Sequence, residues 1–132
     1  MVLLDTHAWV WWLTKPDMLP KKATQVIRAA MKDYDVHIST MSTWEIAMLV
    51  ARGRLEFATD YREFIRQTQQ LAFVKFVAPD NTILLHSVEL PGYAGKAPAD
   101  RIIVATANHL SATLVTKDET MLGYRQVRTV WG

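Results

Sequence analysis

The sequence predicts a three-layer α/β/α sandwich, an α/β fold in which helices cover both faces of a mainly parallel sheet. Short apolar strands alternate with amphipathic helices along the chain, and this alternation favours right-handed crossovers between parallel strands. The length of 132 residues and the hydrophobic content of 50% suit one domain spanning residues 1–132. The charged fraction of 21% and the net charge of +2 are typical of a globular chain and not of a disordered one.

The composition also excludes several classes of protein. The chain has no cysteine, which rules out disulfides, cysteine nucleophiles and zinc fingers with thiolate ligands. The apolar stretch at residues 8–13 is too short for a signal core or a bilayer span. We therefore expect a cytoplasmic protein that does not associate with membranes. The pI near 9.0 permits nucleic-acid binding without requiring it.

The N-terminal part of the chain predicts one strand and two helices. Residues 2–4 are apolar and end at an acid, which is typical of a strand buried on both faces. A helix through Trp9 and Trp12 follows and ends before Pro16. Residues 21–32 carry apolar side chains at the i, i+3, i+4, i+7 spacing of an amphipathic helix.

The middle of the chain predicts two more strands and two more helices. Residues 36–39 form the second strand, and residues 42–52 form a helix that ends at Gly53, where a left-handed cap is expected. Residues 60–71 repeat the helical pattern. The alternation in residues 73–77 predicts the third strand.

The C-terminal part completes the alternation. Residues 83–90 predict a helix, and the Gly-containing stretch at 92–96 predicts a loop. Pro98 opens the next helix, because proline fits the first helical position. The apolar runs at 113–115 and 127–130 predict the last two strands.

Four acids stand where predicted strands end or predicted helices begin. Asp5 and Asp118 follow strands, whereas Glu45 and Asp100 fall in the first turns of helices. In a parallel sheet these positions share one edge, so we expect the four side chains to converge. Carboxylate oxygens suit hard cations such as Mg²⁺ or Mn²⁺. A metal-activated water beside a phosphodiester would give the chemistry of a hydrolytic nuclease.

Each acid also has a purely structural interpretation. Residues Ser42 to Glu45 match a capping box, in which Glu45 bonds back to the backbone at the helix start. Asp5 could cap the first helix, Asp118 could begin a short helix, and Asp100 could complement a helix dipole. For any single acid the structural interpretation is favoured. What favours the metal site is the coincidence of four such acids at one edge of one sheet.

Aromatic side chains cluster in the first predicted helix. Trp9 and Trp12 lie at helical spacing and are expected in the core, whereas Trp11 is expected on the exposed face. His7 is assigned a structural role at the helix start, because imidazole suits Mg²⁺ less well than carboxylate does.

Five motifs are spread over nearly the whole chain, namely Leu3-Leu4-Asp5-Thr6-His7, Ser42-Thr43-Trp44-Glu45-Ile46-Ala47, Gly53-Arg54-Leu55, Pro98-Ala99-Asp100-Arg101 and Leu114-Val115-Thr116-Lys117-Asp118. With these motifs the chain resembles the PIN domain, and specifically the VapC toxins of type II toxin-antitoxin modules. One motif alone would be unspecific, but the five together are specific. The stretch at 92–97 departs from the short polar turn usual in that family.

The resemblance implies a Mg²⁺- or Mn²⁺-dependent endoribonuclease that is inhibited by a cognate antitoxin protein and forms a homodimer. Asp5, Glu45 and Asp100 correspond to the family's three core metal-site acids and Asp118 to its more variable fourth. Thr116 matches a frequent hydroxyl position. Transfer, ribosomal and messenger RNA all stay open as the RNA substrate. An exposed Trp11 could contribute to a groove for an antitoxin segment.

Two other functions stay open. One is an Asp-based phosphotransfer protein, although Thr6 and His7 stand where the receivers and phosphatases of that kind would carry a second acid. The other is a noncatalytic module that binds RNA or a protein partner on the same fold. Arg101 and Lys117 each adjoin a site acid, and each is assigned either to substrate binding or to charge balance.

Overall fold

A five-stranded parallel sheet forms the centre of the computed structural model, which describes residues 1–132. In spatial order the strands are β3 (Val74–Val77), β2 (Val36–Ser39), β1 (Val2–Leu4), β4 (Thr113–Val115) and β5 (Thr129–Val130). Every neighbouring pair is parallel. The predicted three-layer α/β/α sandwich is therefore confirmed, and its sheet is parallel throughout.

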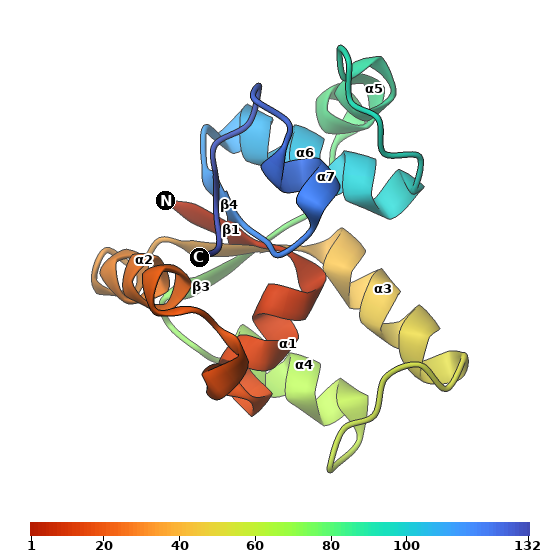
Figure 1. Ribbon diagram of the computed structural model, residues 1–132. Coiled ribbons are helices and arrows are strands. Elements are labelled where there is room, and N and C mark those ends of the chain that lie inside the picture. The colour runs from red at the N-terminus through yellow and green to blue at the C-terminus, as the bar shows by residue number, and fades with distance from the viewer.

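The helices form two layers on either side of this sheet. In chain order they are α1 (Thr6–Thr14), the 3₁₀ turn η1 (Pro16–Met18), α2 (Lys21–Lys32), α3 (Thr40–Ala51), α4 (Tyr61–Gln69), α5 (Asn81–Glu89), α6 (Pro98–Leu110) and α7 (Glu119–Leu122). Figure 1 shows α1, α2 and α4 on one side of the strands and α5, α6 and α7 on the other. None of the helices combines the length and the apolar character needed to span a membrane.

The central strand β1 separates two hydrophobic cores. Val2 and Leu4 pack into the core beneath α1 and α2, whereas Leu3 packs into the core beneath α6. Successive side chains of a strand point to opposite faces, so a strand covered on both faces must be apolar at every position. This requirement explains the continuous apolar run at the start of the sequence.

Helix α3 begins two residues before the predicted start. Ser39 is its N-cap, and the Ser39 side chain accepts a hydrogen bond from the backbone N–H of Met41 at 3.0 Å. Ser42 is therefore inside the helix and fully buried. The capping-box interpretation of Ser42 and Glu45 is wrong, because Ser39 already caps this helix and Glu45 lies beyond its first turn.

The end of α3 is as predicted. Gly53 has a φ of +68°, a left-handed conformation that glycine adopts without steric cost. Its N–H donates to the Val50 carbonyl at 3.0 Å, and the Arg54 N–H donates to the Leu49 carbonyl at 2.9 Å. This pair of bonds is the Schellman motif, which pairs carbonyls left free at a helix end.

Other boundaries also differ from the prediction: α4 is shorter than residues 60–71, and β3 begins one residue after 73. Helix α5 starts at Asn81 and not at residue 83, because the Asp80 side chain caps it by accepting from the Ile83 N–H at 2.9 Å. Strand β5 is only Thr129–Val130, shorter than the predicted 127–130. Val127 is apolar because it packs in the α6-side core, not because it belongs to a strand.

Trp9 is fully buried as predicted, and its indole N–H donates to the Thr68 hydroxyl at 3.1 Å. Trp12 packs at the border of the same core. The prediction that Trp11 is exposed is wrong: it is half-buried, with its ring centroid 6.0 Å from that of Trp131. The C-terminal segment supplies this cover, which the pattern of the first helix does not reveal.

Candidate metal centre

The parallel sheet carries the predicted site acids to one edge. Asp5 directly follows β1, and its backbone N–H donates to the Val115 carbonyl at the end of β4 at 3.0 Å. The register aligns Leu4 with Val115, so the segments carrying Asp5 and Asp118 leave the sheet side by side. Loops and helix starts at this edge form the usual ligand site of a parallel α/β sheet.

Three of the predicted acids come close enough to share one ion. Asp5, Glu45 and Asp100 each offer a carboxylate oxygen, and these oxygens lie within 4.8 Å of one another. Asp118 lies outside this triad but lines the same cavity of about 260 Å³. No hydrophobic side chain lines this cavity, whose lining residues are Asp5, Thr6, His7, Glu45, Asp100, Lys117 and Asp118.

Asp5 is held by two hydrogen bonds and is only 9% exposed. Its Oδ1 accepts from the backbone N–H of Thr6 at 2.8 Å, and its Oδ2 accepts from the Thr116 hydroxyl at 2.7 Å. Asp5 is also the N-cap of α1. The structural and the metal-site interpretations of this acid are therefore compatible, since a carboxylate offers about four lone-pair sites.

Glu45 is oriented from the neighbouring helix. The Thr6 hydroxyl lies 2.6 Å from Glu45 Oε1 and 3.0 Å from the Ser42 hydroxyl. Sequence reasoning did not identify Thr6 and Ser42 as site residues. The available signal was a hydroxyl directly after Asp5 and another three residues before Glu45, which places it one helical turn away on the same face.

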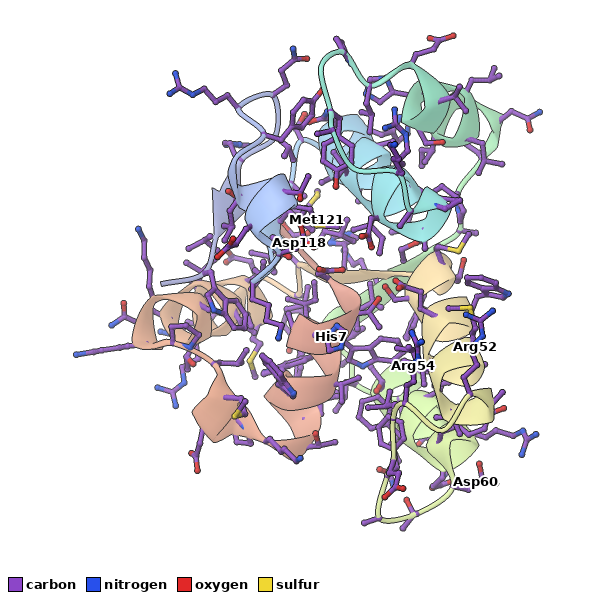
Figure 2. All side chains as sticks on the ribbon, turned by 45° about the vertical axis from the view of Figure 1, so that its right-hand side comes forward. His7, Arg52, Arg54, Asp60, Asp118 and Met121 are labelled. Carbon is purple, nitrogen blue, oxygen red and sulfur yellow. The ribbon has the colours of Figure 1, made fainter.

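Asp118 and Asp100 differ in how firmly they are held. Asp118 caps α7: its Oδ1 accepts from the Met121 N–H at 2.9 Å, and its own N–H donates to the Thr116 hydroxyl at 3.0 Å. Figure 2 labels Asp118 and Met121 at this turn, with His7 on the facing helix α1. The Asp100 side chain, in the first turn of α6, forms no hydrogen bond with the chain.

The pKa of each triad carboxyl is raised above its ordinary value. Burial is the main cause that raises the pKa of Asp5 and of Glu45 above their usual range. Burial, followed by the negative charges of Asp5, Glu45 and Asp118, raises the pKa of Asp100 to about 7. Carboxylates crowded in this way repel one another, and a bound cation relieves that repulsion.

The fold is a parallel α/β/α sandwich with a cavity of carboxylates at the C-terminal edge of its sheet. The family model of the PIN domain matches residues 2–126. The chain therefore belongs to the PIN-domain family. It is 33% identical to Ribonuclease VapC22 of Mycobacterium tuberculosis over 132 residues, which are 98% of this chain and 98% of that protein.

Solved structures share the fold at lower identity. VapBC2 from Rickettsia felis, bound to a DNA fragment from its promoter, superposes with a TM-score of 0.70 at 16% identity over 100% of both chains. FitAcB from Neisseria gonorrhoeae superposes with a TM-score of 0.66 at 22% identity over 98% of this chain and 96% of that chain. At these identities the similarity shows the fold alone.

Proposed function

We propose that this chain is a metal-dependent endoribonuclease that hydrolyses RNA phosphodiester bonds and acts as the toxin of a toxin-antitoxin pair. The observation that carries the proposal is the triad of Asp5, Glu45 and Asp100, with oxygens within 4.8 Å of one another. The 33% identity to a protein named as a ribonuclease, over nearly the full length of both, supports the substrate class.

The donor set fits a hard divalent cation. It contains oxygen atoms only, and a positive charge would favour the ionised form of carboxyls whose pKa is raised by burial. We propose that Asp5, Glu45, Asp100 and Asp118 hold Mg²⁺, or Mn²⁺ in its place, directly or through water. When bound, such an ion activates water and stabilises the charge that develops on the phosphate oxygens.

The chain's own residues hold the acids in place for this reaction. Thr116 and the Thr6 N–H fix both oxygens of Asp5, and the Thr6 hydroxyl fixes one oxygen of Glu45. Asp100 has no such partner, so both of its oxygens are free to bind an ion or to orient a water. Preorganised ligands of this kind reduce the reorganisation needed during the reaction.

The proposed partners follow from the family. Solved structures with this fold include the DNA-bound VapBC of Salmonella typhimurium and a toxin-antitoxin complex from Klebsiella pneumoniae. We propose that a cognate antitoxin protein binds this chain, that the chain is a single domain over residues 1–132, and that it acts in the cytoplasm as a homodimer. Size-exclusion chromatography with light scattering tests the dimer.

Cleavage of a structured RNA pool tests the activity. We would incubate the purified protein with Mg²⁺, with Mn²⁺ and with chelator, beside an Asp5→Asn variant whose fold is checked by circular dichroism. The expected result is metal-dependent cleavage that the variant loses. A folded, antitoxin-free protein that neither cleaves RNA nor binds metal in calorimetry would instead be a noncatalytic binding module.

A further inference from the structure

Two cations adjoin site acids in the sequence, and the structure gives them different surroundings. Arg101 follows Asp100, but its guanidinium is turned toward the end of α5 and the loop after it. It donates to the carbonyls of Ser87 at 2.8 Å, Gly95 at 2.7 Å, and Val88 and Tyr93 at 3.3 Å each. Arg101 therefore ties the 90–97 loop to α6 and does not line the acid cavity.

Lys117 lines the acid cavity and is the only lysine or arginine that does so. It is exposed, and none of the ion pairs in the structure involves it. Its ammonium instead lies 4.6 Å from the centre of the Trp11 ring. A cation over an indole face is attracted by the ring electrons, which favours one position of the ammonium without removing its charge from solvent.

Trp11 packs against two other aromatic rings. Its ring centroid lies 6.0 Å from that of Trp131 in the C-terminal segment and 6.0 Å from that of His7 one helical turn earlier. The backbone beneath Lys117 is fixed as well, since the Thr116 hydroxyl bonds both Asp5 and the N–H of Asp118. The ammonium is therefore held at the rim of the cavity by ordered groups.

The charge of the cavity shows what such an ammonium can do. Four carboxylates line the cavity against one lysine, and one divalent ion leaves them with excess negative charge that repels an RNA backbone. On the basis of the proposed nuclease function, we propose that Lys117 binds a backbone phosphate of single-stranded RNA beside the acids. Trp11 is the positioning residue that holds the ammonium ready for this contact.

The binding of a labelled, mixed-sequence single-stranded RNA tests the proposal. Fluorescence anisotropy would be measured in Ca²⁺ over a series of salt concentrations for the wild type, Lys117→Met and Lys117→Arg. A lost phosphate contact lowers the slope of log affinity against log salt by about 0.7 on single strands. We expect Lys117→Met to show this loss with binding about five- to tenfold weaker, and Lys117→Arg to restore most of it.

Two further variants separate the phosphate contact from other effects. Lys32→Met is the matched control, because exposed Lys32 ends α2 just before the start of β2, at the edge of the sheet opposite the cavity. It should bind like the wild type. Trp11→Leu should weaken RNA binding about threefold while keeping the salt slope, and Trp11→Phe should restore the affinity.

The outcomes distinguish this inference from the proposed function. If the wild type cleaves RNA and Lys117→Met matches it in affinity and salt slope, the nuclease proposal stands and the phosphate contact is wrong. If the wild type cleaves nothing but its RNA binding depends on Lys117 as expected, the contact stands and the nuclease proposal fails. A wild type that binds no RNA overturns the contact.

Discussion

Asp100 is the one triad carboxyl that accepts no hydrogen bond from the rest of the chain. Asp5 and Glu45 accept hydrogen bonds from Thr116 and Thr6, whereas Asp100 is half-buried among like charges with no such partner. An acid in this position destabilises the metal-free fold when it ionises, because burial and the neighbouring carboxylates oppose its charge. Protonation or a bound cation relieves this repulsion.

Asp100→Asn should therefore stabilise the metal-free protein at alkaline pH. The folded pKa of about 7 lies above the unfolded value near 3.8, so the contribution of Asp100 to stability is present below pH 4 and is lost as the pH rises through 7. Solvent screens this half-buried charge, so we expect Asp100→Asn to gain only about 2 kcal/mol in the free energy of unfolding at pH 8. This gain should vanish near pH 4. Urea unfolding in chelator measures it, and equal stabilities at pH 8 would contradict the expectation.

Thr116 connects two of the site acids through one hydroxyl. Thr116→Val keeps the side-chain shape but removes the bond to Asp5 and the acceptor for the Asp118 N–H. We expect Mg²⁺ affinity to fall about tenfold and stability to fall by about 1–2 kcal/mol. Calorimetric titration and urea unfolding measure the two effects. Thr116→Ser should retain both properties, and unchanged Mg²⁺ affinity in Thr116→Val would show that this hydroxyl does not support the site.

At the scale of elements, two of the proposed metal-site acids are also helix caps. Asp5 caps α1 and Asp118 caps α7, yet both side chains also line the cavity. A role as a helix cap therefore does not exclude a role as a metal ligand for these two residues. A helix that starts at the C-terminal edge of a parallel sheet needs an acceptor at its N-terminus, and that place is also the ligand site.

Substitution of Gly53 tests how strongly the end of α3 depends on the left-handed conformation of this residue. A Cβ added there would meet no atom within 4 Å, so the penalty of Gly53→Ala comes only from the φ of +68°. We expect a loss of about 1 kcal/mol in the free energy of unfolding. Gly53→Asn should lose less, because asparagine tolerates the left-handed region better. Equal stability of the alanine variant and the wild type in urea unfolding would contradict the assignment of a Schellman end.

At the scale of the whole molecule, one sheet supports both cores and the acid edge. The side chains of β1 alternate between the two cores, and Asp5 directly follows its last residue. An ion held by Asp5, Glu45 and Asp100 would join the start of α1 to α3 and α6, and its binding would oppose unfolding of the whole domain. Ligands that bind only the folded state stabilise that state by mass action.

Mg²⁺ should therefore raise the melting temperature. At one hundred times its dissociation constant the ion contributes about 2.7 kcal/mol, which corresponds to a rise of about 10 °C for a domain of this size. Differential scanning calorimetry with and without Mg²⁺ measures the shift, and Asp5→Asn should show almost none. A wild type and variant that respond equally would place the ion elsewhere.

The sequence by itself determined the fold class, the bounds of several elements and a set of four acids that line one cavity. Strand and helix periodicity depend on neighbouring residues, so α2 and β2 are found at their predicted bounds. Acids after strands of a parallel sheet must meet at one edge whatever the details of packing. This topological rule is why Asp5, Glu45, Asp100 and Asp118 could be chosen together without coordinates.

Only the tertiary structure decided how these groups are arranged. The Thr116 bond to Asp5 joins residues 111 positions apart, and the Thr6 bond to Glu45 joins residues 39 apart. Such contacts depend on strand register and helix rotation, which local pattern does not specify. Local pattern also did not specify that Arg101 donates to backbone carbonyls. Nor did it specify that Trp11 packs against Trp131 and lies beneath the Lys117 ammonium. Side-chain direction is set by packing between distant segments, so the chemistry of the cavity rim could be read only from the folded chain.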